Sequence, residues 1–200
     1  MAETGGITVR RAEPEDFGRI ETLLRDIGEL HRMHRPDIFG DAAVKYSSDE
    51  FAEILADAGR PVYVACGRDG TVIGYAFCVI RDIKETKLLN ERREMYLDDL
   101  CVDGSFRGQG VGSILFRHVS DEAARFGCTS LELNVWSFNS PAIAFYEKMG
   151  MKPRNTHYEI RVGDGGDAAG GGNGRLKKNE RDVSLSDPYG TVRRRGGKAW

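Results

Sequence analysis

The sequence predicts a single α/β domain in which helices cover the faces of one mixed sheet. A β-hairpin pattern at residues 61–81 is followed by an alternation of strand, helix, strand and helix between residues 95 and 151. This order of elements is typical of a mixed sheet with helices on its faces. Hydrophobic residues make up 40% of the 200 positions, which is enough to form a core.

The first part of the chain is expected to contain one strand and two helices. Residues 7–12 alternate between apolar and polar side chains, which indicates a strand. Apolar residues then recur at helical spacing, and this predicts a helix over 14–34. A shorter helix is expected at 48–59, with Ser47 or Ser48 as its N-cap.

The later elements follow from the same kind of pattern. Two apolar runs flank the turn sequence Arg68-Asp69-Gly70, which predicts the hairpin. We expect the remaining elements in this order: a charged loop at 82–93, a strand at 95–103, a helix at 112–126, a strand at 130–136, a short helix before Gly150, and a strand pair or extended run at 152–162.

The glycine-rich segment Arg107–Gly112 lies between a predicted strand and a predicted helix. At such a junction several backbone N–H groups and the positive end of the helix dipole point toward one place. Three glycines leave no Cβ in the way of a bulky anion. The segment therefore predicts a phosphate or pyrophosphate site; a tight turn that uses glycine only for its geometry is the alternative.

Two common phosphate-binding patterns do not fit this segment. A P-loop needs Lys followed by Ser or Thr after its last glycine, whereas Gly112 is followed by Ser113 and Ile114. The dinucleotide fingerprint requires glycine at position 113. The pattern that does fit is Arg-x-x-Gly-x-Gly with aliphatic neighbours.

A second motif follows the next predicted strand. Asn139 precedes a short helix that ends in the sequence Phe-Tyr-Glu-Lys-Met-Gly at 145–150. In this order and spacing, the two motifs resemble the signatures of the GNAT N-acetyltransferase superfamily over residues 95–153. The resemblance implies a mixed, mostly antiparallel central sheet flanked by helices, with a splayed strand pair that forms an acyl-CoA cleft. It also implies acetyl-CoA as the acyl donor substrate.

The resemblance further assigns residues to acetyl-CoA binding. The strand stretch 100–102 would offer an N–H group to the thioester carbonyl and pair with the pantetheine arm, and the glycine loop would hold the pyrophosphate. Asn139 and Asn134 would hydrogen-bond the arm. The complete set of expected cofactor-binding residues is Leu100, Cys101, Val102, Arg107, Gly108, Gln109, Gly110, Val111, Gly112, Asn134, Asn139 and Tyr146.

Three residues are the candidates for catalysis. An amine acceptor must lose a proton, and Asp98 and Asp99 are candidate bases, with Glu132 in reserve. Strand alternation would place the two aspartates on opposite faces, one of them toward the cleft; the alternative is that both lie at a polar edge. Tyr146 matches the family tyrosine that protonates the leaving thiolate, although a packing role is the alternative. Cys101 is expected to be a core cysteine and not a nucleophile.

The segment after the first predicted helix is a candidate wall of the acceptor pocket. It carries two histidines, an arginine and an aromatic residue, namely His31, His34, Arg35 and Phe39. The resemblance places this segment over the acyl-CoA cleft, whereas a polar helix end is the plain alternative. No cysteine or clear third ligand stands near the histidines, so no metal site is expected.

Composition argues against several other classes of protein. The first residues have no basic start followed by an apolar run, and no stretch approaches the roughly 18 apolar residues of a membrane span. Four scattered cysteines suggest reduced thiols and a cytoplasmic location, and a net charge of -2 gives no general attraction to nucleic acid. The expected partners are acetyl-CoA and an amine acceptor, and the sequence leaves a homodimer open.

The predicted domain spans residues 1–162, followed by a tail at 163–200. The tail holds ten of the 25 glycines and a short basic run at 193–195, so we expect it to be disordered. The expected activity is transfer of an acetyl group to a primary amine of a small molecule, peptide or protein by direct attack. The alternatives are a non-catalytic acyl-CoA-binding regulatory module and a nucleic-acid-associated factor that uses the basic tail.

Overall fold

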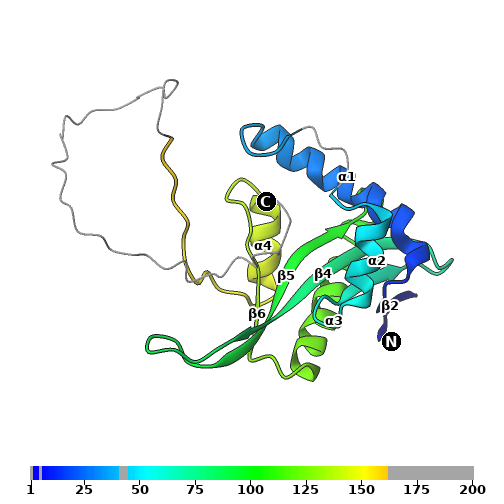
Figure 1. The fold of residues 1–200 in the computed structure, drawn as a ribbon. Helices are drawn as coiled ribbons and strands as arrows, with labels where there is room; N and C mark the ends of the chain where they lie inside the picture. The colour runs from blue at the N-terminus through cyan, green and yellow to red at the C-terminus, as the bar shows by residue number, and fades with distance from the viewer. Residues whose placement is uncertain (1, 5, 41–44, 162–200) are drawn as a thin grey trace. The chain divides into compact units, whose positions relative to one another are not determined.

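A six-stranded sheet with its strands in chain order is the central element of the unit Met1–Arg154 (Figure 1). The computed structural model describes residues 2–4, 6–40 and 45–161, and the chain divides into two units, Met1–Arg154 and Asn155–Trp200. The sheet belongs to the first unit, and the predicted tail lies outside the described residues. The strands are β1 (Ala2–Thr4), β2 (Ile7–Arg11), β3 (Val62–Cys66), β4 (Val72–Ile83), β5 (Arg92–Val102) and β6 (Ser130–Glu132).

Neighbouring strands run antiparallel, except that β5 and β6 run parallel. The predicted mixed, mostly antiparallel sheet is therefore confirmed. The parallel pair arises because a helix connects β5 to β6, whereas the turn between β3 and β4 returns the chain directly.

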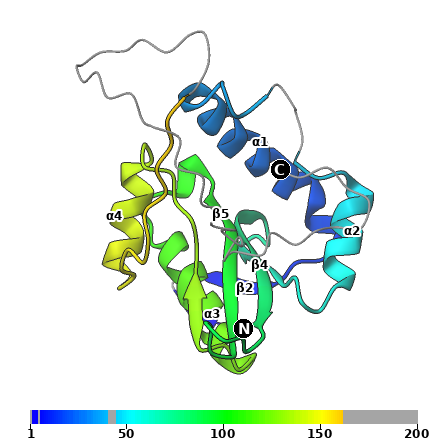
Figure 2. The ribbon, with the colours of Figure 1, turned by 60° about the vertical axis from the view of Figure 1, so that its left-hand side comes forward.

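Helices cover both faces of the sheet. Their bounds are α1 (Phe17–His34), α2 (Ser48–Ala56), α3 (Val111–Arg125) and α4 (Ser140–Lys148), and a short 3₁₀ turn, η1 (Pro14–Asp16), precedes α1. One core joins α1 and α2 to the face of Tyr75 and Phe77. A second core joins α3 to the opposite face, with Met95 and Leu97 in it. Figure 2 shows α2 and α4 on opposite sides of β5.

Local chemistry explains where the helices begin and end. Ser47 is the N-cap of α2, and its hydroxyl and the Glu50 carboxylate satisfy each other's backbone N–H groups as a capping box. α1 ends at His34, and Arg35 no longer has helical backbone angles. Pro36 explains this end, because a proline disfavours the helical conformation of the residue before it.

Two expected bounds were wrong. The hairpin of β4 and β5 continues to the pair Ile83–Arg92, so the predicted loop at 82–93 shrinks to 84–91. β6 covers only 130–132 of the strand expected at 130–136, because the chain leaves the sheet there. For 152–162 the expectation was a strand pair or an extended run, and no strand is formed over 152–161.

Asp16 anchors the start of α1 to β2. Its buried carboxylate accepts two hydrogen bonds from the Arg10 guanidinium, at 2.7 and 2.8 Å, and one from the Glu13 N–H at 2.8 Å. Burial alone would raise the pKa of Asp16, but the hydrogen bonds from Arg10 and Glu13 lower it below its usual value.

Replacing Asp16 by Ala is expected to lower the free energy of unfolding by about 1–3 kcal/mol, since Arg10 and the Glu13 N–H lose their partner. A carboxyl whose pKa falls on folding adds stability above its unfolded pKa of about 3.9 and loses it as the pH drops below that value. Urea titrations at neutral and acidic pH should therefore differ less in Asp16→Ala than in the parent protein. Exposed Glu15→Ala serves as the control, and an unchanged pH dependence in Asp16→Ala would contradict the assignment.

Candidate active site

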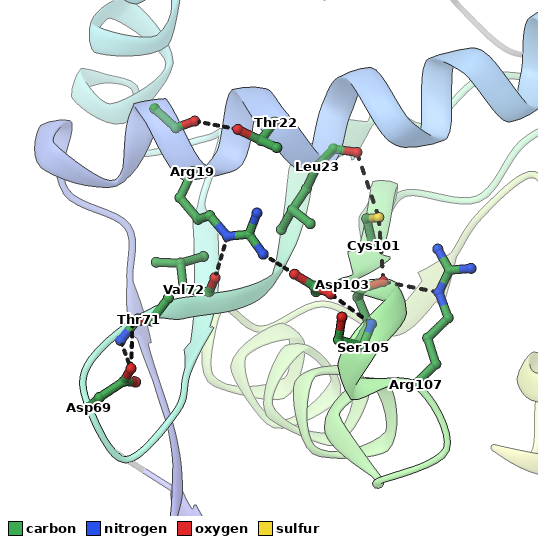
Figure 3. Close-up of polar contacts among 12 residues, drawn as sticks. Arg19, Thr22, Leu23, Asp69, Thr71, Val72, Cys101, Asp103, Ser105 and Arg107 are labelled. Carbon is green, nitrogen blue, oxygen red and sulfur yellow. Dashed lines mark hydrogen bonds and ion pairs between the residues drawn. The ribbon is translucent and has the colours of Figure 1, made fainter.

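The turn that leaves β5 is fastened to α1 by ionic and polar contacts (Figure 3). The Asp103 carboxylate forms an ion pair with the Arg19 guanidinium and accepts a hydrogen bond from the Ser105 N–H at 2.7 Å. Arg19 Nε also donates to the Val72 carbonyl at 3.1 Å. The start of the glycine loop therefore has a fixed position relative to α1 and β4.

The glycine loop forms the start of α3. Gly108 and Gly110 have φ values of +76° and +88°, in the left-handed region that favours glycine. Gly110 is the N-cap of α3, and no side chain caps this helix. The N–H groups of Val111, Gly112 and Ser113 have no partner within the helix, because the ladder starts at the Ile114 N–H bonded to the Gly110 carbonyl. The junction thus offers free amides and a positive dipole end to an anion.

Two side chains of the loop stabilise its own backbone. Arg107 Nε donates to the Val102 carbonyl at 3.1 Å, and the Gln109 amide donates to the Ser105 carbonyl at 3.0 Å. Both residues are exposed. The structure therefore places Arg107 and Gln109 at the predicted loop, as supports of its shape.

The strand pair next to the loop opens where β6 ends. Pairing between β5 and β6 covers only Glu94–Tyr96 against Ser130–Glu132. From Leu97 onward β5 has no strand partner on this side among the described residues. The resulting open edge includes the stretch Leu100-Cys101-Val102, and it leads directly into the glycine loop.

A β-bulge changes the side-chain alternation of β5. Phe77 pairs with Asp99 and the adjacent Cys78 pairs with Leu97, so Asp98 is an extra residue. Leu97 and Leu100 consequently face the core under α3, whereas Cys101 faces the core under α1 and α2. The expectation that Asp98 and Asp99 lie on opposite faces was therefore wrong, because the bulge brings both carboxylates to one side.

Both carboxylates contact the ammonium group of Lys45. Lys45 Nζ lies 3.2 Å from Asp98 Oδ2 and 3.2 Å from Asp99 Oδ2, and 5.3 Å from the centre of the Tyr46 ring. Burial disfavours the charge of Lys45, but the carboxylate of Asp99, then Tyr46 and Asp98, raise its pKa above the usual value. The sequence did not point to Lys45, because its position beside residues 53 and 54 places further along the chain depends on the fold.

Asp99 is the more enclosed of the two aspartates, with 14% of its side chain exposed against 35% for Asp98. Burial, followed by the charge of Asp99, raises the pKa of the Tyr75 hydroxyl and of the Tyr146 hydroxyl. The Tyr75 hydroxyl is fully buried and has no hydrogen-bond partner among the described residues. Asp99 therefore acts electrostatically on both the buried Tyr75 hydroxyl and the predicted acid, Tyr146.

Tyr146 and Cys101 flank the open edge from different elements. Tyr146 extends from α4, with its ring 5.1 Å from that of Phe145 and 6.1 Å from that of Phe116. Its raised pKa keeps the phenol protonated at neutral pH. Burial raises the pKa of the Cys101 thiol to about 11, and its Sγ lies 3.8 Å from the Leu23 carbonyl, which suits a core position and disfavours a thiolate.

The end of α1 meets the segment between β6 and α4 through aromatic contacts. The His31 ring stacks on Phe39 at 5.1 Å, and the His34 ring stacks on Phe138 at 4.5 Å. The Arg35 guanidinium lies 5.7 Å from the centre of the Trp136 ring. The four residues predicted for the acceptor wall are thus brought together. Trp136 and Phe138 complete the cluster, and their only signal in sequence was two aromatics close before Asn139.

Burial lowers the pKa of His31 below the usual value for histidine, and the charge of Asp99 opposes this effect. Lys45 and His34 add to the lowering. The charges of both Lys45 and Asp99 therefore affect the pKa of His31. This effect links the aromatic cluster electrostatically to the carboxylates.

Three other candidates make local contacts. The side-chain oxygen of Asn139 accepts the Ala142 N–H at 3.2 Å and caps α4. Burial raises the pKa of Tyr96 on the neighbouring strand, and Asn134 opposes this effect. Glu132, the reserve base, pairs with Arg154 and accepts a hydrogen bond from the Ser130 hydroxyl at 3.1 Å. These bonds position the segment that follows β6.

Within the described ranges, no cluster of three or more His, Cys, Asp or Glu side chains could hold a metal ion. In the same part of the chain, no helix has the length and apolar character to cross a membrane.

Comparison with known proteins agrees with this geometry. Residues 24–151 match the model of the acetyltransferase (GNAT) family, which is more than half of the chain. An L-amino acid N-acetyltransferase, AaaT, from Escherichia coli is 30% identical over 169 residues, which cover 81% of this chain and 94% of that protein. The chain belongs to the GNAT acetyltransferase family, and its activity is acetyl-CoA-dependent N-acetyl transfer.

Other relatives support the same assignment. A thialysine N-epsilon-acetyltransferase from Bos taurus is 28% identical over 154 residues, covering 72% of this chain and 83% of the relative. Among solved structures, a tetramutant of the BH1408 protein from Bacillus halodurans shares the fold, with a TM-score of 0.75 at 24% identity, covering 78% of this chain and 99% of that one.

Proposed function

We propose that this chain binds acetyl-CoA along the open edge of β5 and transfers its acetyl group directly to a primary amine. The observation that supports this proposal is that an unpaired strand edge and a set of unpaired helix amides adjoin. The unpaired edge of β5 at 100–102 runs into the free amides at the start of α3. A pantetheine arm could add to the edge as an extra strand while the pyrophosphate meets the amides.

In this reaction the amine nitrogen attacks the carbonyl carbon of the thioester. A C–N bond forms and the C–S bond breaks, a proton passes from the amine to a carboxylate, and the leaving thiolate takes a proton. We assign the carboxylate to Asp99 and the proton donor to Tyr146. Asp99 is supported by its enclosure and by its electrostatic effect on Tyr146, whereas Asp98 is more exposed.

For the acceptor, we propose a small amine that meets the aromatic cluster of His31, His34, Phe39, Trp136 and Phe138. The names of the relatives include acceptors as different as thialysine and L-amino acids, all of which carry a primary amine. Aromatic faces and an acidic pair suit a protonated amine attached to an apolar stem.

Thiol release from acetyl-CoA in the presence of a panel of amines tests the proposal. Release that depends on one class of amine is expected. A protein that binds acetyl-CoA without releasing thiol with any amine would support the non-catalytic acyl-CoA-binding module in its place.

Replacing Gly110 by Glu is expected to abolish acetyl-CoA binding, because a negative side chain would stand where the pyrophosphate meets the α3 amides. Titration calorimetry should show an affinity at least about tenfold weaker. Gly127→Glu is a matched control, since Gly127 also has a positive φ (+72°) and open surroundings but follows the other end of α3. Equal affinity in the two variants would contradict the pyrophosphate site.

Replacing Asp99 by Asn is expected to lower kcat/KM for the amine by roughly 10²–10⁴-fold, the usual contribution of a general base. Asp98→Asn is its matched control and should have a smaller effect, because Asp98 is more exposed. Steady-state kinetics at saturating acetyl-CoA provide the measurement. A larger loss in Asp98→Asn would assign the base to Asp98.

Replacing Tyr146 by Phe keeps the ring contacts and removes the hydroxyl. We expect kcat to fall by about 10²–10⁴-fold with little change in acetyl-CoA affinity, as for a group that acts only in the transition state. Tyr158→Phe is the control, because this tyrosine is 88% exposed. Turnover of Tyr146→Phe at the parent rate would assign the ring a packing role.

A further inference from the structure

We propose that Lys45 is a self-acetylation site, at which the enzyme uses its own side chain as the acceptor amine. The inference rests on the proposed function, because it requires acetyl transfer at the edge of β5. It adds a covalent modification of a defined residue to the transfer reaction.

The first step of the argument is the position of the ammonium. Lys45 Nζ contacts both Asp98 and Asp99 at 3.2 Å. An acceptor amine must also bring its nitrogen to this pair if Asp99 is to take its proton. Lys45 thus holds a primary amine, on a four-carbon stem, at the place that the acceptor nitrogen would occupy.

The second step concerns the surroundings of the acidic pair. The Tyr75 hydroxyl is fully buried without a hydrogen-bond partner among the described residues, and the charge of Asp99 acts on it. The ring of Tyr46 lies 5.3 Å from Nζ and gives the cation an aromatic face. The pair is therefore part of a partly enclosed site that is suited to a primary ammonium.

The third step is the chemistry. Asp99 takes a proton from the ammonium, and the neutral Nζ attacks the thioester carbonyl of acetyl-CoA. A C–N bond forms, the C–S bond breaks, and Tyr146 protonates the leaving thiolate. Nζ loses its second proton as the amide forms, and this proton restores the Tyr146 phenol by way of solvent. The product, an N-acetyl-lysine, has no positive charge, so its ion pairs with Asp98 and Asp99 are lost and both carboxylates become available to an external amine.

The raised pKa of Lys45 sets the expected rate of this step. At neutral pH most molecules carry the charged ammonium, and only the deprotonated amine can attack. Self-acetylation is therefore expected to be slower than transfer to a well-bound external acceptor, and to take place when acetyl-CoA is present without one.

The test is incubation of the full chain with acetyl-CoA and no amine, followed by intact-mass and peptide mass spectrometry. We expect one acetyl group on Lys45, at a first-order rate that does not change with protein concentration.

Lys45→Arg keeps the charge and should gain no acetyl group at this position. Lys84→Arg is the matched control, since Lys84 is an exposed lysine outside the site, and it should be acetylated at Lys45 at the parent rate. Tyr146→Phe should slow the modification by about 10²-fold or more.

Acetylation of Lys45 no faster than that of Lys84 in the parent protein would overturn the inference. A rate that rises with protein concentration would also overturn it, because a second molecule would then supply the lysine. Thiol release with an external amine panel separates the two proposals. Release without any modification of Lys45 leaves the proposed function standing and removes only this inference, whereas the lack of both reactions removes both.

Discussion

A single extra residue in β5 reverses the side-chain alternation of the strand beyond Asp98. Before this residue, Met95 and Leu97 face the core under α3, and after it Leu100 takes up the same face. The bulge thereby places Asp98 and Asp99 on the side of α1 and α2, where Lys45 and His31 also lie. The acidic pair and its contacts with Lys45 depend on this one-residue shift.

The second constraint is the early end of β6. A parallel pair that covers three residues on each strand leaves the remainder of β5 with an open edge. Backbone groups at such an edge favour pairing with an added strand. The turn at Asp103 directs this edge into the glycine loop, and the Arg19 ion pair fixes the turn to α1. The open edge of β5 thus continues into the unpaired amides at the start of α3.

Charge compensation explains why Lys45 lies where it does. Two adjacent carboxylates on one face repel each other, and Asp99 is partly withdrawn from solvent. A cation that contacts both removes this cost. Under the proposed function, the same property would make the pair a site for the acceptor amine. Lys45, which neutralises the pair, would then be both a stabilising partner and a competitor for the acceptor.

The sequence by itself determined the glycine loop, the Phe-Tyr-Glu-Lys helix, the family and most of the sheet. These features depend on local rules: helical and strand periodicity, capping at Ser47, and the glycines that take left-handed conformations at 108 and 110. Tyr146 and the loop were found because their neighbours in sequence define them.

Only the tertiary structure decided the rest of the site. The bulge at Asp98 depends on how β5 pairs with β4. A sequence pattern that assumes strict alternation of side chains along a strand does not reveal an inserted residue. Lys45 and Tyr75 meet Asp99 across large separations in the chain, and Trp136 meets Arg35 in the same way. Such contacts follow from how helices pack on the sheet, which no local signal encodes. The expected strand at 130–136 ended early because the chain leaves β5 after Glu132, although β5 itself continues to Val102, and no local pattern marks this divergence.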